Sequence, residues 1–85
     1  MEEIEIGKVI RFFSKIGVAA IRITGGELKV GDTIKFKGHV TDFEQYVDSM
    51  QVEHKDVSEA KSGDAVGIKV DQKVKEGDSV YKITE

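Results

Sequence analysis

The sequence predicts an all-β fold, a small closed antiparallel β-barrel, and three observations carry this prediction. Short runs rich in Ile, Val, Phe and Thr are separated by closely spaced Gly and Gly-Asp turn signals. Apolar and polar residues alternate with period 2, and a helical period of 3.6 residues is hard to find. The chain has 85 residues and no Pro, so we expect one domain, residues 1–85, with six or seven short strands. A closed barrel would also remove exposed sheet edges.

The first expected strand, residues 4–13, does not alternate cleanly. Its even-numbered positions from 4 to 12 are hydrophobic except for Lys8, whereas Val9 lies on the opposite face. A bulge near Gly7 would resolve the conflict, because Gly tolerates bulge geometry.

The later strands alternate more regularly. In residues 19–23, Arg22 stands opposite two isoleucines, and in residues 33–37 two lysines stand opposite Ile34 and Phe36. Residues 79–83 also alternate, with Val80 on one face. The segment Asp42–Tyr46 is the one place that admits a helical turn, and it is too short to decide.

A six-residue phrase, Lys-x-Gly-Asp-x-Ile/Val, occurs at residues 29–34, 61–66 and 75–80. Gly accepts a positive φ at no steric cost, and Asp accepts backbone N–H bonds in turns. We therefore predict three structural turns that each feed a strand. Their residues are Gly31, Asp32, Gly63, Asp64, Gly77 and Asp78.

Two alternatives for this phrase find less support. The three aspartates could converge at one rim of the barrel as metal ligands or acid–base groups, but nothing else in the sequence indicates such a site. The intervals between the phrases, 32 and then 14 residues, exclude a uniform tandem repeat.

The sequence contains no recognisable catalytic or cofactor motif. It has no Cys, no P-loop and no nucleophile elbow. His39, Asp42 and His54 match no established metal-site spacing, so we expect no enzyme activity, no metal and no cofactor. No run approaches the ~20 apolar residues of a membrane span, and the acidic start is wrong for a signal peptide. We expect a cytoplasmic protein without a membrane or nucleotide partner.

Charge is distributed unevenly along the chain. The net charge is -3, but residues 7–40 carry seven basic and two acidic groups, or +5, and the rest carries six basic and fourteen acidic groups, or -8. Such asymmetry hints at a partner for the first half, although an ordinary mixed surface is the simpler explanation. The candidate RNA-binding residues, all on expected strands, are Arg11, Arg22, Lys35 and Lys37.

Aromatic residues near these basic positions favour RNA binding, because small barrels hold RNA with basic strands and aromatic platforms. The aromatics in question are Phe12, Phe13, Phe43 and Tyr46. The alternative is that aromatics fill the core, which we expect for Phe36 and for one of Phe12 and Phe13.

Three stretches, LKVGDTIKFKG, VDSMQVEHKDVSEAKSGDAVGIKV and VKEGDSVY, together resemble the second domain of elongation factor Tu. The Glu-Ala-x-x-Gly-Asp-x-Val-Gly element at residues 59–67 is the specific part, and the resemblance runs from about Gly7 to Ile83. It implies a closed antiparallel barrel of the translation-factor type. The family's GTPase and third domains have no counterpart in these residues, so we do not expect GTP-driven elongation. No residue that holds the aminoacyl end of tRNA is matched here.

Two segments, FSKIGVA and DSMQVEHKDV, are also similar to the small C-terminal barrel of the collagenase-like peptidase family. Members of that family are linked to RNA modification. The two resemblances imply a non-catalytic binding module that acts in RNA or ribosome association. The alternative is a protein–protein adaptor that docks onto a separately encoded collagenase-like peptidase or RNA-modifying enzyme.

Overall fold

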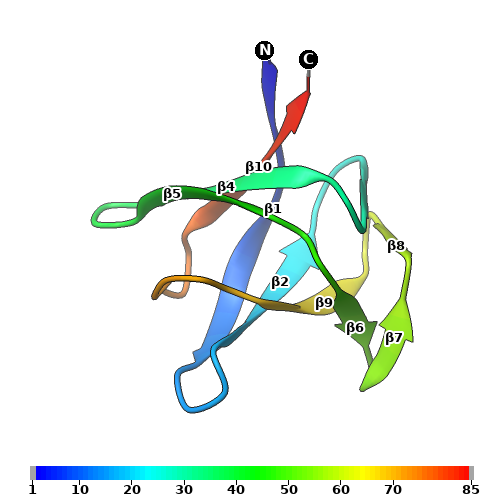
Figure 1. The fold of residues 1–85 in the computed structure, drawn as a ribbon. Helices are drawn as coiled ribbons and strands as arrows, with labels where there is room; N and C mark the ends of the chain where they lie inside the picture. The colour runs from blue at the N-terminus through cyan, green and yellow to red at the C-terminus, as the bar shows by residue number, and fades with distance from the viewer. Residues whose placement is uncertain (1, 85) are drawn as a thin grey trace.

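The computed structural model describes residues 2–84, which form strands joined by turns and loops (Figure 1). None of these residues lies in a helix, so no helix of the described chain could cross a membrane. The strands are β1 (Glu2–Phe13), β2 (Val18–Ile23), β3 (Glu27–Lys29), β4 (Thr33–Lys37), β5 (Asp42–Tyr46), β6 (Met50–Val52), β7 (Lys55–Val57), β8 (Glu59–Lys61), β9 (Ala65–Lys69) and β10 (Ser79–Thr84).

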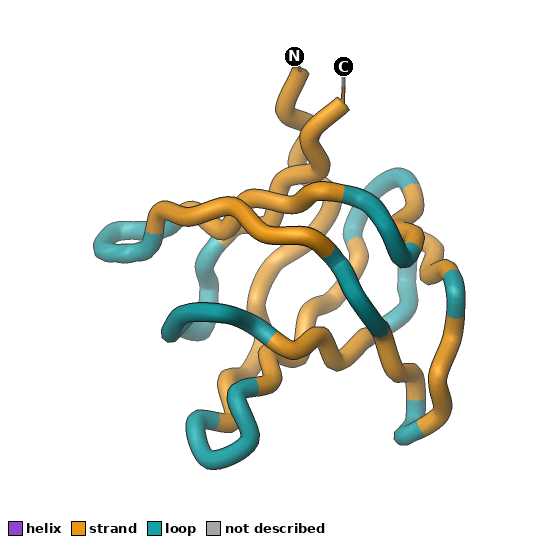
Figure 2. Tube along the Cα trace, in the orientation of Figure 1, coloured by secondary structure: helices purple, strands orange, loops and turns teal. Residues whose placement is uncertain are grey.

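Eight of the strands form one antiparallel sheet in the order β5-β4-β10-β1-β2-β9-β6-β7, and β3 pairs with β8 in a second sheet. The large sheet curls around a common interior, and the start of β1 lies beside the end of β10 (Figures 1 and 2). The all-β, antiparallel part of the prediction is confirmed. Four strands have only three residues, which is why the alternation pattern indicated fewer of them.

The predicted closure of the barrel is not confirmed, because the ladder of the described strands ends at β5 on one side and at β7 on the other. A buried side chain spans part of the gap beside β5. Gln45 Nε2 donates to the carbonyl of Lys69 at 2.9 Å, and the N–H of Asp71 donates to Gln45 Oε1 at 2.9 Å. The amide thus replaces a strand–strand ladder between β5 and the chain that follows β9.

The segment Asp42–Tyr46 forms strand β5 and not a helical turn. Phe43 and Gln45 face inward and the residues between them face solvent, the alternation of a half-buried strand. Pairing with β4, from Thr33 opposite Tyr46 to Lys37 opposite Asp42, decides this conformation.

Strand β1 changes register twice, between Glu5 and Gly7 against β10 and between Val9 and Arg11 against β2. The first shift is the bulge predicted near Gly7, where a Cβ would collide with the carbonyl oxygen of Arg22. The second shift was not predicted. Together they explain the mixed alternation of this strand, because its inward side chains do not share one parity. Those side chains are Ile6, Val9 and, half-buried, Phe12.

The core lies inside the curled sheet and is aliphatic except for a few aromatic rings. Phe36 and Phe43 are buried there and stack with ring centroids 5.1 Å apart. Phe12 is half-buried and packs against the core, whereas Phe13 is 41% exposed. The expectation of core positions for Phe36 and for one of Phe12 and Phe13 is thus met, and the assignment of Phe43 to a binding surface is wrong.

The three Lys-x-Gly-Asp phrases adopt the same turn. In each, the N–H of Asp donates to the carbonyl of the Lys three residues earlier, at 2.9 to 3.1 Å, and the Lys N–H donates back to Asp Oδ2 at 2.8 to 2.9 Å. The glycines Gly31, Gly63 and Gly77 have φ of 98°, 97° and 89°. A four-residue turn with a positive φ at its third position is a type II turn, which requires Gly or Asn there.

Each turn is also anchored to one buried residue of another segment. The Gly N–H donates to that residue's carbonyl, and that residue's N–H donates to the Asp carbonyl, all at 2.7 to 2.9 Å. The anchoring residues are Val47, Ile23 and Val9, in the order of the turns. The Lys-x-Gly-Asp motif therefore recurs because the fold uses the same anchored type II turn three times.

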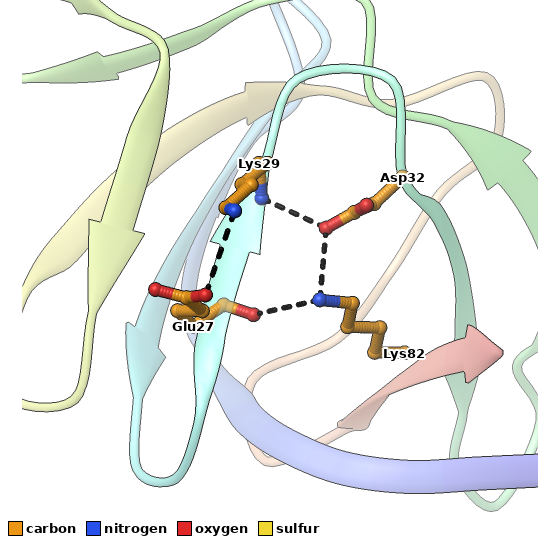
Figure 3. A network of polar contacts seen from close by, with 4 residues as sticks. All are labelled: Glu27, Lys29, Asp32 and Lys82. Carbon is orange, nitrogen blue, oxygen red and sulfur yellow. Dashed lines mark hydrogen bonds and ion pairs between the residues drawn. The ribbon is translucent and has the colours of Figure 1, made fainter.

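The aspartate side chains are engaged in these turns. Asp32 accepts the Lys29 N–H at 2.8 Å and faces Lys82 Nζ at 3.3 Å, while Lys82 Nζ also donates to the Glu27 carbonyl at 3.4 Å (Figure 3). This arrangement ties β10 to the first turn. Within residues 2–84, no three His, Asp or Glu side chains gather in a way that could hold a metal ion.

Candidate nucleic-acid interface

Three basic side chains line up across the outer face of the large sheet. Lys37 on β4 stands opposite Ser79 on β10, Ser79 stands opposite Lys8 on β1, and Lys8 stands opposite Arg22 on β2. We call Lys37, Lys8 and Arg22 the basic row. All three are exposed, and none forms an ion pair within 4.0 Å with any described residue.

Lys35 lies on the same strand as Lys37 but in a different environment. Its Nζ is 3.6 Å from a carboxylate oxygen of Glu3 and 3.9 Å from one of Asp42, and its side chain is only 17% exposed. Asp42 stands opposite Lys37 in the register, yet its carboxylate lies within ion-pair distance of Lys35 and not of Lys37. Lys35 is therefore partly neutralised by acids of the protein itself.

Arg11 begins a second line across the sheet. It stands opposite Ala20 on β2, Ala20 stands opposite Gly67 on β9, and Gly67 stands opposite Gln51 on β6. The guanidinium carbon of Arg11 lies 5.9 Å from the ring centroid of Phe13, within cation–π range. Arg11 and Phe13 share the outer face because both follow the second bulge of β1.

An open groove of about 310 Å³ occupies the outer face beside Arg11. Its floor consists of small or short side chains, its first wall comes from the β1–β2 hairpin, and its second wall comes from the β6–β7 hairpin. The floor side chains are Val18, Ala20, Ala65 and Gly67, the first wall is Phe13 and Ile16, and the second wall is Gln51, Glu53 and His54; Val66 also borders the groove, but it is 1% exposed and belongs to the core.

The first wall leaves apolar surface open to solvent. Ile16 is 65% exposed and Phe13 is 41% exposed. Two apolar side chains thus stand open to solvent on one side of the groove.

The second wall is held by an unusual hairpin turn. Glu53 and His54 have φ of 53° and 66°, and they form the two-residue connection between Val52 and Lys55. Two successive positive φ values define a type I′ turn, which normally uses Asn or Gly. Gln51 Nε2 donates to Asp56 Oδ1 at 3.1 Å across this hairpin.

The structure thus brings Arg11, Arg22 and Lys37 to one continuous outer face and separates Lys35 from them by its ion pairs. Sequence reasoning missed Lys8 and the groove. Lys8 was visible as a cation inside an apolar alternation, but its place beside Arg22 depends on a register that the sequence does not state. The available signal for the groove was the small outward residues Ala20 and Gly67 on expected strands.

Known proteins resemble this chain in sequence and in fold. A family model, elongation factor Tu domain 2, matches residues 17–81. An uncharacterised protease of Methanocaldococcus jannaschii is 48% identical over 84 residues, which are 98% of this chain and 20% of that protein. A collagenase of Porphyromonas gingivalis (strain W83) is 37% identical over 82 residues, 95% of this chain and 20% of that protein. The chain spans about a fifth of the length of these relatives.

Two crystal structures have the same fold. Both show the C-terminal domain of a Geobacillus thermoleovorans protein assigned to the U32 peptidases. One gives a TM-score of 0.86 at 20% identity, covering 96% of this chain and 93% of that chain. Its selenomethionine variant gives 0.84 at 19% identity, covering 89% and 95%. Both predicted resemblances, to elongation factor Tu and to the collagenase-like peptidases, are confirmed, and because the family model covers most of its length, the chain belongs to the elongation factor Tu domain 2 family.

Proposed function

We propose that this chain is a non-catalytic binding module that acts in RNA or ribosome association through the outer face of β1, β2 and β9. One observation carries the proposal. Cations without an ion pair among the described residues and an open apolar groove share this face, although the whole chain has a net charge of -3. Phosphates require the first feature and bases require the second.

The side chains around the groove suit an unpaired nucleotide. The Phe13 ring offers a stacking platform, and Arg11 beside it offers a positive charge for the adjoining phosphate. The Gln51 amide carries both donors and acceptors, and its bond to Asp56 uses only one of them. A base in the groove could therefore be stacked on one side and hydrogen-bonded on the other.

The proposal assigns no catalysis to the chain. Its counterparts with the names protease and collagenase are about five times longer. The repeated aspartates serve the turns, where each caps a backbone N–H. A binding role suits these residues better than a hydrolytic one.

The test is binding of a fluorescein-labelled single-stranded RNA, followed by anisotropy. Phe13→Ala should weaken binding roughly 5- to 150-fold, because stacking of one base on an aromatic ring contributes about 1–3 kcal/mol. Tyr46→Ala is the matched control, since Tyr46 is an aromatic residue on β5 that is 67% exposed and lies outside the groove. Equal losses in the two variants would contradict a site at the groove, and wild-type protein that binds no RNA would contradict the proposal itself.

A second candidate function, a protein–protein adaptor, rests on the similarity to the protease and collagenase. The chain would dock onto a separately encoded collagenase-like peptidase or RNA-modifying enzyme, and the apolar wall of the groove would receive a side chain of that partner. Co-purification with such a protein, abolished by Phe13→Ala and insensitive to ribonuclease, would favour the adaptor over RNA binding.

A further inference from the structure

We infer that the basic row is a track for the phosphate backbone of a single RNA strand, which crosses β4, β10, β1 and β2 at right angles and reaches the groove. The inference rests on the proposed function and extends it, because it defines the ligand as an oligonucleotide strand and not as a mononucleotide or a duplex. Lys8 becomes its central contact.

The first support is the continuity of the row with the groove. Arg22, the last cation of the row, stands opposite Ala65 on β9, and Ala65 belongs to the groove floor. A strand that follows the row therefore arrives at the groove without leaving the outer face.

The second support is the length of the row. Neighbouring strands lie about 4.8 Å apart, so the three steps from Lys37 to Arg22 cover about 14 Å. A stacked strand advances about 3.4 Å per phosphate, so roughly four phosphates lie alongside the row. Ser79, between Lys37 and Lys8, has a hydroxyl that can donate to one of these phosphates.

The third support is that no described acid forms an ion pair with the basic row, a property that Lys55, Lys61 and Lys69 share and that three other lysines on the strands lack. Lys35 pairs with Glu3 and Asp42, Lys82 pairs with Asp32, and Lys29 pairs with Glu27. A strand of phosphates on the basic row would meet cations that the described part of the protein does not neutralise.

A single strand fits this face better than a duplex. The bases of a duplex are paired and stacked and cannot turn into the groove at the end of the row, whereas those of a single strand can be splayed out onto an aromatic side chain. The row supplies the phosphate contacts, and the groove takes one base.

The test is a length series of fluorescein-labelled oligouridylates with two, four, six and eight nucleotides, measured by anisotropy in 50 to 200 mM salt. Affinity should rise up to about six nucleotides and then level off. The three contacts of the basic row and the contact of Arg11 beside the groove give a log–log salt slope of about -2.8 on a single strand, which is an affinity loss of roughly 50-fold over this salt range. The dinucleotide should show a weaker dependence.

The variant Lys8→Gln/Lys37→Gln should lose the gain with length and keep a loss of only about 7-fold over the same salt range, since the contacts of Arg22 and Arg11 remain. Its dinucleotide binding should equal that of the wild type. The matched control is Lys29→Gln/Lys61→Gln, which removes the same charge from the two-stranded sheet of β3 and β8. Melting temperatures of both variants establish that the fold is intact.

The outcomes separate the two levels of the hypothesis. Equal effects of the two double variants, affinity independent of length, or tighter binding of a duplex of the same length would overturn the track while RNA binding stands. A wild-type protein that binds none of the oligouridylates would overturn RNA binding, and the track with it.

Discussion

Replacement of Gly63 by Ala should destabilise the protein through backbone strain alone. Gly63 has a φ of 97°, and a Cβ built there would meet no atom within 4 Å. A side chain at this φ costs about 1–3 kcal/mol. The lower entropy of the unfolded chain offsets about 0.4–1 kcal/mol. The net loss in the free energy of unfolding is therefore about 1–2 kcal/mol.

The assay is thermal unfolding followed by circular dichroism, with urea titration for the free energy. In a domain of this size, 1 kcal/mol lowers the melting temperature by about 4–8 °C, so the Gly63→Ala variant should melt roughly 5–15 °C below the wild type. Gly31→Ala should cost about the same, because Gly31 has a φ of 98° and equally open surroundings.

Gly25→Ala provides the matched control. Gly25 is not among the glycines with positive φ, and the nearest atom to its built Cβ is the Glu5 carbonyl oxygen at an ordinary 3.8 Å. This variant should equal the wild type or be slightly more stable. A Gly63→Ala variant that melts with the wild type, or together with Gly25→Ala, would refute the argument from the turn.

Three further substitutions, at Gly7 and Gln45, test the sheet. Gly7→Ala should lower the free energy of unfolding by about 1–3 kcal/mol, as overpacking does, because the Cβ would collide with the Arg22 carbonyl; urea titration measures the loss, and wild-type stability would argue against the close approach at this bulge. Gln45→Leu should cost about 1–3 kcal/mol for each backbone group left without a partner and speed hydrogen exchange at the Asp71 amide, and unchanged exchange there would contradict the bridge from β5. In Gln45→Glu, burial should raise the pKa of the new carboxyl above its unfolded value of about 4.3. The folded state then holds the proton more tightly than the unfolded state, so the variant should lose stability as pH rises above about 4.3. A stability difference from the wild type that does not change with pH would exclude a buried carboxyl.

Local features of this protein could be predicted because a few adjacent residues decide them. The type II turn at Gly63-Asp64 depends on one positive φ, one backbone bond and one side-chain bond, all within residues 61–64. Period-2 alternation likewise needs only neighbouring residues, so the inward placement of Ile34 and Phe36 could be predicted.

The candidate site could be predicted only in part. Arg11, Arg22 and Lys37 lie on the outer face. Period-2 alternation predicts that a side chain points outward, but it does not predict which acidic side chains lie within ion-pair distance of it. Lys35 satisfies the same pattern as Lys37 and is partly neutralised by Glu3, which is 32 positions away in the sequence. The sequence thus predicted that the outer face carries basic side chains, but not which of them are free of ion pairs.

By itself, the sequence determined the all-β class, the three turns and the general location of the positive charge. The tertiary structure decided the second bulge of β1, the open ends of the large sheet, the strand at residues 42–46 and the alignment of Lys8 with Arg22. The reason is physical: strand register is decided by hydrogen bonds and side-chain packing between segments distant in sequence, and a shift of one residue moves every side chain to the other face.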